Sequence, residues 1–142
     1  LQPEAMQLMP DVPGCLLRMG LTQLIGGALI GSQPTAGWHR DVGTPARYWA
    51  ALREYLEKRR TDSANLPSGV IVRPPVWVGS GVTLEEGCVV GPYVVLEGRS
   101  RIKSGAHVER SAIYDAEITA KVSGVLQLAE LVMPFEAAPP PT

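Results

Sequence analysis

Aliphatic residues recur every six positions between Leu66 and Thr119 of this chain. When every sixth position is sampled from Leu66, eight of nine residues are Leu, Ile or Val, and the ninth is Tyr114. The series four residues later mixes aliphatic with small side chains such as Cys88 and Ser100. A short fixed period of this kind is typical of a parallel β-helix, in which inward side chains stack from coil to coil. The pattern therefore predicts about three coils, each built from three hexapeptides.

A different period, close to that of an α-helix, follows Thr44. Thr44 is a favourable N-cap, and Pro45 suits the first helical position because it needs no amide hydrogen there. Because no sheet is expected in residues 1–60, we expect this helix to pack on the rest of a longer protein or on another copy. Its apolar stripe is predicted to comprise Tyr48, Ala51, Leu52, Tyr55 and Leu56.

The two periods divide the chain into four predicted parts and place it in the α+β class. Residues 1–60 form a mixed first segment, and the polar residues 61–65 form a linker. Residues 66–119 form the β-helix. Residues 120–142 are expected to cap the open end of the stack and to finish in a disordered, proline-rich tail.

Composition restricts the function classes. The net charge is −1 with no basic patch, which argues against nucleic acid as a partner. No apolar stretch is long enough to span a bilayer, and the first residues do not resemble a signal peptide, so no membrane association is expected. Cys15 and Cys88 lack metal-binding spacing, which favours a reducing, cytoplasmic location, with Cys88 buried in the repeats.

The clearest indication of a chemical function comes from the segment Gly37-Trp38-His39-Arg40-Asp41-Val42-Gly43-Thr44-Pro45-Ala46-Arg47-Tyr48. It resembles the segment that closes the catalytic domain of sugar nucleotidyltransferases, above all bacterial mannose-1-phosphate guanylyltransferases and glucose-1-phosphate nucleotidyltransferases. In that family a helix and a left-handed hexapeptide β-helix often follow, in the order found here. The resemblance extends to about Thr119. It implies a truncated C-terminal piece of an α/β nucleotidyltransferase domain, followed by a short left-handed parallel β-helix.

The resemblance also implies a reaction. Family members transfer a nucleotidyl group from an NTP to a sugar 1-phosphate and release pyrophosphate. The position of Asp41 implies one of two acidic ligands to a catalytic Mg²⁺, a cation that would neutralise charge between two anionic substrates. Trp38, Gly43 and Thr44 are implied as substrate-binding residues.

Several parts of the family's catalytic machinery are absent from this sequence. The glycine-rich nucleotide loop, the first metal-binding aspartate and the phosphate-binding lysines have no counterparts. We therefore expect the chain to be inactive alone, and to form a homo-oligomer or to associate with the missing catalytic half.

Two other hypotheses for the function are compatible with the sequence. The chain could be a non-catalytic assembly or regulatory module, with Val76-Trp77 and Val94-Val95 forming an apolar contact surface. It could also be a hexapeptide acyltransferase that uses His107 as general base, although three coils are few and no long loop interrupts them. As a residue in isolation, Asp41 would be an ordinary turn residue and His39 ordinary polar surface.

Overall fold

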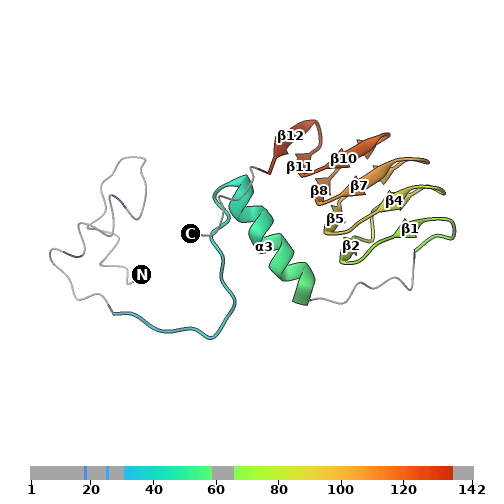
Figure 1. Cartoon of the computed structure of the whole chain (residues 1–142). Helices are drawn as coiled ribbons and strands as arrows, with labels where there is room; N and C mark the ends of the chain where they lie inside the picture. The colour runs from blue at the N-terminus through green and yellow to red at the C-terminus, as the bar shows by residue number, and fades with distance from the viewer. Residues whose placement is uncertain (1–17, 19–24, 26–30, 59–65, 136–142) are drawn as a thin grey trace. The chain divides into compact units, whose positions relative to one another are not determined.

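The computed structural model describes residues 18, 25, 31–58 and 66–135. The chain divides into two compact units, Leu1–Trp38 and His39–Thr142. In the first unit, residues 31–38 form no helix or strand and are exposed. The described residues of the second unit form the helix α3 (Pro45–Lys58) and twelve strands (Figure 1). The predicted linker 61–65 and the proline-rich tail 137–142 lie outside the described residues, as does most of residues 1–30.

Helix α3 begins where the sequence predicts. The amide of Arg47 donates to the Thr44 hydroxyl at 3.3 Å, and the amide of Tyr48 donates to the Thr44 carbonyl at 2.9 Å. Thr44 is therefore the N-cap, and Pro45 is the first helical residue. The buried face differs in part from the predicted stripe: Trp49 is buried, whereas Tyr55 is exposed.

Within residues 66–135, the strands form three sheets around one core. Figure 1 labels the strands of the first two sheets described below. Sheet A has the order β1-β4-β7-β10, with bounds Ile71–Val72, Val89–Val90, His107–Glu109 and Lys121–Ser123. Sheet B has the order β12-β11-β8-β5-β2, with bounds Leu131–Pro134, Val125–Leu128, Ser111–Tyr114, Val94–Glu97 and Val76–Val78. Sheet C has the order β3-β6-β9, with bounds Thr83–Leu84, Arg101–Ile102 and Glu117–Ile118.

Every pairing of these strands is parallel except that of β12 with β11, which is antiparallel. Parallel strands that return to the same sheet after each turn make residues 66–135 a parallel β-solenoid, on which α3 packs. The handedness of the predicted β-helix stays a prediction.

Coil length falls along the solenoid. Val76 pairs with Val94, a separation of three complete hexapeptides. Val94 then pairs with Ser111, so the next coil is one residue shorter. Ala112 pairs with Leu126, and this coil is shorter again. Strands β10 and β11 continue the coils beyond Thr119, and β12 turns back against β11.

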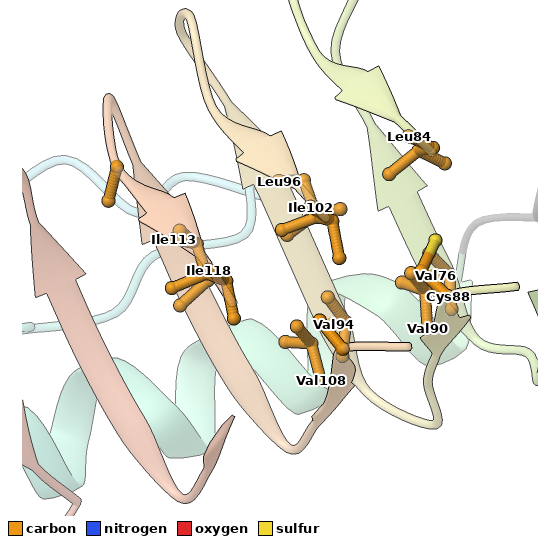
Figure 2. Packing of buried hydrophobic residues seen from close by; sticks show 12 residues of the cluster. Val76, Leu84, Cys88, Val90, Val94, Leu96, Ile102, Val108, Ile113 and Ile118 are labelled. Atoms are coloured by element: carbon orange, nitrogen blue, oxygen red, sulfur yellow. The ribbon is translucent and has the colours of Figure 1, made fainter. Parts of the chain in front are cut away.

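Inward aliphatic side chains of successive coils meet in a single core (Figure 2). Val90, Leu96, Ile102 and Val108 are fully buried, as the six-residue period predicts. Cys88 is also fully buried, which confirms its predicted packing role.

The period fails after Val108. Tyr114, which stands at an aliphatic position of the six-residue series and so suggests the end of regular stacking, lies outside the solenoid core, as does Ala112, and Ile113 occupies the core instead. Ala112 and Tyr114 contact the helix α3 on the other face of sheet B. The coil between β5 and β8 is one residue short, and a shift of one residue exchanges the two faces of a strand.

Helix α3 packs on sheet B of the same chain, which corrects the expectation that it needs a partner from outside (Figure 1). Trp49, Leu52 and Leu56 form one buried cluster with Val95 and Ala112. This cluster also corrects the proposed contact surface of the assembly-module reading. Val76 and Val94 lie in the solenoid core, and Val95 is covered by α3.

No helix among the described residues is both long and apolar enough to cross a membrane.

Candidate functional site

The candidate site is the turn of residues 39–44, called here the Asp41 turn, which leads into α3. One carboxylate oxygen of Asp41, Oδ1, accepts a hydrogen bond of 3.0 Å from the Gly43 amide. This bond from a carboxylate to the amide two residues later closes an Asx turn. A Cβ atom added to Gly43 would lie 3.2 Å from the same oxygen, so glycine lets the backbone pass close to the carboxylate.

The second carboxylate oxygen of Asp41 pairs with a cation. Asp41 Oδ2 lies 2.6 Å from the Nη1 atom of Arg47, which is in the first turn of α3. Both side chains are largely exposed. The sequence did not predict that Arg47 pairs with Asp41. The two residues are six positions apart, one in the turn and one in the helix, and no periodic pattern indicates such a pair.

A second ion pair connects the Asp41 turn to the middle of α3. Arg40 donates from Nε to Glu54 at 2.8 Å, and its Nη2 atom lies 2.6 Å from the same carboxylate oxygen. Lys58 contacts the other oxygen of Glu54 at 2.8 Å. The turn is therefore fastened to α3 at two points, one through Arg40 and one through Arg47.

The other predicted site residues are all exposed. Trp38 has 48% of its surface exposed and belongs to the first compact unit, whereas Asp41, Gly43 and Thr44 belong to the second. Thr44 uses its hydroxyl as the N-cap of α3. His39 is exposed, and its carbonyl accepts a hydrogen bond of 3.0 Å from Arg40.

Asp41 is a suitable single ligand for Mg²⁺ but not a complete site. Its carboxylate offers exposed, hard oxygen atoms, and Mg²⁺ usually takes only one or two protein carboxylates beside water and phosphate oxygens. The part of the chain that the structure describes holds no group of three or more His, Cys, Asp or Glu side chains able to bind a metal. The remaining ligands would have to come from elsewhere.

Helix α3 connects the Asp41 turn to the solenoid. The Tyr48 and Tyr114 hydroxyls lie 2.6 Å apart, and the Trp49 ring stacks on Phe135 with centroids 4.7 Å apart. Tyr93 donates to Glu57 at 3.1 Å near the other end of the helix. Burial, followed by the hydrogen bond to Tyr114, raises the pKa of the Tyr48 phenol well above its ordinary value.

His107, the residue of the acyltransferase reading, lies on sheet A. Its Nε2 atom is 3.5 Å from Glu109, and Lys121 contacts the same carboxylate at 3.4 Å. The hydrogen bond from Lys121 is the main cause that lowers the pKa of Glu109. Glu109 thus pairs with Lys121, whereas the His107 Nε2 atom is buried and has no hydrogen-bond partner within the described part of the chain.

A hollow of about 710 Å³ opens at the first coil of the solenoid. Its lining includes aliphatic residues such as Leu66, Val78 and Leu84, together with Trp77 and Glu97. The Trp77 indole donates to Glu97, so these two polar groups satisfy each other. Neither the Asp41 turn nor His107 lines this hollow.

Known proteins similar to this chain include mannose-1-phosphate guanylyltransferases of plants. Mannose-1-phosphate guanylyltransferase 1 of Arabidopsis thaliana is 35% identical over 78 residues, which are 54% of this chain and 22% of the relative. Probable mannose-1-phosphate guanylyltransferase 3 of Oryza sativa subsp. japonica is 33% identical over the same shares. Probable mannose-1-phosphate guanylyltransferase 2 of Arabidopsis thaliana is 32% identical over 107 residues, 67% of this chain and 29% of the relative.

The chain thus spans less than a third of the length of these relatives. No protein-family model matches it. The similarity and the β-solenoid nevertheless agree with the resemblance carried by the Trp38–Tyr48 motif and the six-residue repeat. The chain is related to part of the mannose-1-phosphate guanylyltransferases, and its solenoid is consistent with a C-terminal β-helix piece of such an enzyme.

Proposed function

We propose that this chain is the C-terminal portion of an NDP-sugar synthase that transfers a nucleotidyl group from an NTP to a sugar 1-phosphate. The observation that carries the proposal is the order of parts within one compact unit. The Asp41 turn, α3 and the β-solenoid follow one another in residues 39–135. Similarity to several mannose-1-phosphate guanylyltransferases makes GTP and mannose 1-phosphate the substrates to test first.

Asp41 would act through Mg²⁺ in this reaction. When bound, the cation neutralises charge that develops between the attacking phosphate oxygen and the α-phosphate. Asp41 can supply one carboxylate ligand from an exposed turn, and Trp38, Gly43 and Thr44 would contact the substrate. The nucleotide loop, the phosphate-binding lysines and the second acidic ligand would belong to a catalytic half that is not part of this sequence.

The solenoid would hold the Asp41 turn of the active site in place. Because α3 is attached to the solenoid through Tyr48–Tyr114 and Trp49–Phe135, the Asp41 turn is connected to the coils by a packed helix. We also propose a cytoplasmic location and either a homo-oligomer or association with the catalytic half, as the sequence suggests.

A non-catalytic assembly module is the second candidate. It is favoured by the lack of a multi-carboxylate metal site within residues 31–58 and 66–135, although α3 covers Val95 of the contact surface first considered for it. On this reading the Asp41 turn would be a structural remnant.

An assay of pyrophosphate release with GTP, mannose 1-phosphate and Mg²⁺ distinguishes the synthase hypothesis from the assembly-module hypothesis. We expect no release by the 142-residue chain alone. We expect release by a chain extended upstream to include a glycine-rich nucleotide loop, and a loss of about a hundredfold in that chain with Asp41→Asn. Glu117→Gln, an exposed carboxylate change on the solenoid, is the matched control.

Three results would decide against the proposal. An extended chain that is inactive with all common NTPs and sugar 1-phosphates would favour the assembly module. Full activity of Asp41→Asn would remove Asp41 from the reaction. Turnover by the chain without any upstream extension would show that no further catalytic half is needed.

A further inference from the structure

The Asp41 carboxylate already has a cationic partner. Oδ1 is held by the Gly43 amide at 3.0 Å, and Oδ2 lies 2.6 Å from Arg47 Nη1. A guanidinium group is charged at every physiological pH, so the attraction of Arg47 for this oxygen does not depend on its own protonation. A metal ion approaching Oδ2 would have to displace Arg47 or share the oxygen with it.

The contact is built in a way that permits exchange. Arg47 and Asp41 have side-chain exposures of 61% and 68%, so water screens their attraction. Exposed ion pairs are weak, and exchange of one cation for another should change affinity by only a few-fold. The Gly43 amide and the N-terminus of α3 also favour the carboxylate, so Asp41 keeps its orientation when Arg47 leaves.

We propose that Arg47 is a positioning residue that holds Asp41 as a temporary counter-ion and competes with the divalent cation for Oδ2. This inference rests on the proposed function, because it requires that Asp41 ligate a metal. Arg47 thereby sets how tightly Asp41 takes up the cation. A purely structural Arg47 would stabilise α3 without changing metal affinity.

The test is binding of Mn²⁺, a paramagnetic substitute for Mg²⁺, to the chain extended upstream by the proposed catalytic half, followed by broadening of the Gly43 amide signal in NMR titrations. Arg47→Gln removes the competing charge, and we expect it to strengthen apparent Mn²⁺ binding about two- to fivefold. Arg47→Lys keeps the charge and should stay near the unmodified chain. Arg101→Gln removes an exposed arginine from sheet C and controls for the change in net charge.

The outcomes separate this inference from the proposed function. If Arg47→Gln binds Mn²⁺ no more tightly than Arg101→Gln, while Asp41→Asn abolishes the broadening, Arg47 does not compete and the inference is wrong. If Asp41→Asn leaves the broadening of Gly43 unchanged, or no broadening occurs in any variant, Asp41 is not a metal ligand. The metal-binding role proposed for Asp41 is then wrong, and the inference about Arg47 is wrong with it.

Discussion

In the solenoid, Leu96 and Ile102 are completely buried, whereas in the Asp41 turn even the apolar Val42 keeps 48% of its surface exposed. The solenoid is stabilised by aliphatic side chains that stack coil upon coil. Its inner positions tolerate little change, because protein cores are closely packed. The turn is held by hydrogen bonds and ion pairs in contact with water. The difference suggests that the solenoid supplies rigidity and the turn supplies an accessible carboxylate.

The largest expected effect comes from the solenoid core. Ile102→Ala removes a fully buried side chain, and we expect the free energy of unfolding to fall by about 2–5 kcal/mol. The matched control is Ile71→Ala, because Ile71 is 53% exposed on β1, and its replacement should cost about 0.5 kcal/mol or less. Urea denaturation followed by circular dichroism measures both. Equal losses in the two variants would mean that burial does not distinguish core from surface in this solenoid.

The seam between helix and solenoid should give an intermediate effect. Tyr48→Phe removes the 2.6 Å contact with Tyr114, and we expect a loss of about 1 kcal/mol in the free energy of unfolding. Tyr114→Phe should cost a similar amount, and the double variant should cost clearly less than the sum, because both changes remove one interaction. Strict additivity would show that the two hydroxyls do not interact.

The same seam has a pH dependence of defined sign. Because burial raises the pKa of Tyr48, the folded state holds the phenol proton more tightly than the unfolded state. The resulting stabilisation is complete below a pH of about 10, the ordinary tyrosine pKa, and is lost as pH rises through the raised value. Urea denaturation at a series of alkaline pH values measures this loss, which should be absent in Tyr48→Phe.

The smallest effect on stability is expected in the Asp41 turn. Asp41→Asn keeps an oxygen for the Gly43 amide but removes the ion pair with Arg47, which should cost less than about 1 kcal/mol and diminish in high salt. Urea denaturation at low and high ionic strength measures this. A large, salt-independent loss would contradict the view that the turn is only lightly fastened.

The sequence predicted the solenoid better than it predicted the surroundings of the site. The six-residue period identifies Val90, Leu96 and Ile102 as inward residues because each coil there has one length. It fails at Tyr114 because coil length is set by how corners close, and a missing residue is visible only once the strands are paired.

The start of α3 was predictable from Thr44 and Pro45, since a cap is a local signal. The packing of α3 on Val95 and Ala112 was not predictable, because the outward residues of a solenoid follow no periodic pattern that indicates what they contact. The pairing of Asp41 with Arg47 was likewise invisible, since exposed charges can pair with any nearby group of opposite sign. The roles of Trp38, Gly43 and Thr44 toward substrate stay predictions.

The shortening of successive coils, from β2–β5 through β5–β8 to β8–β11, gives the solenoid a direction. Fewer residues per turn enclose a narrower cross-section, so each coil matches the coil beneath it less well than a uniform stack would. A further coil of full length would find no counterpart of its own width at the tapered end, where β12 runs antiparallel to β11. The number of coils is thus limited by the falling number of residues per coil, in addition to the β11–β12 hairpin at the end of the solenoid.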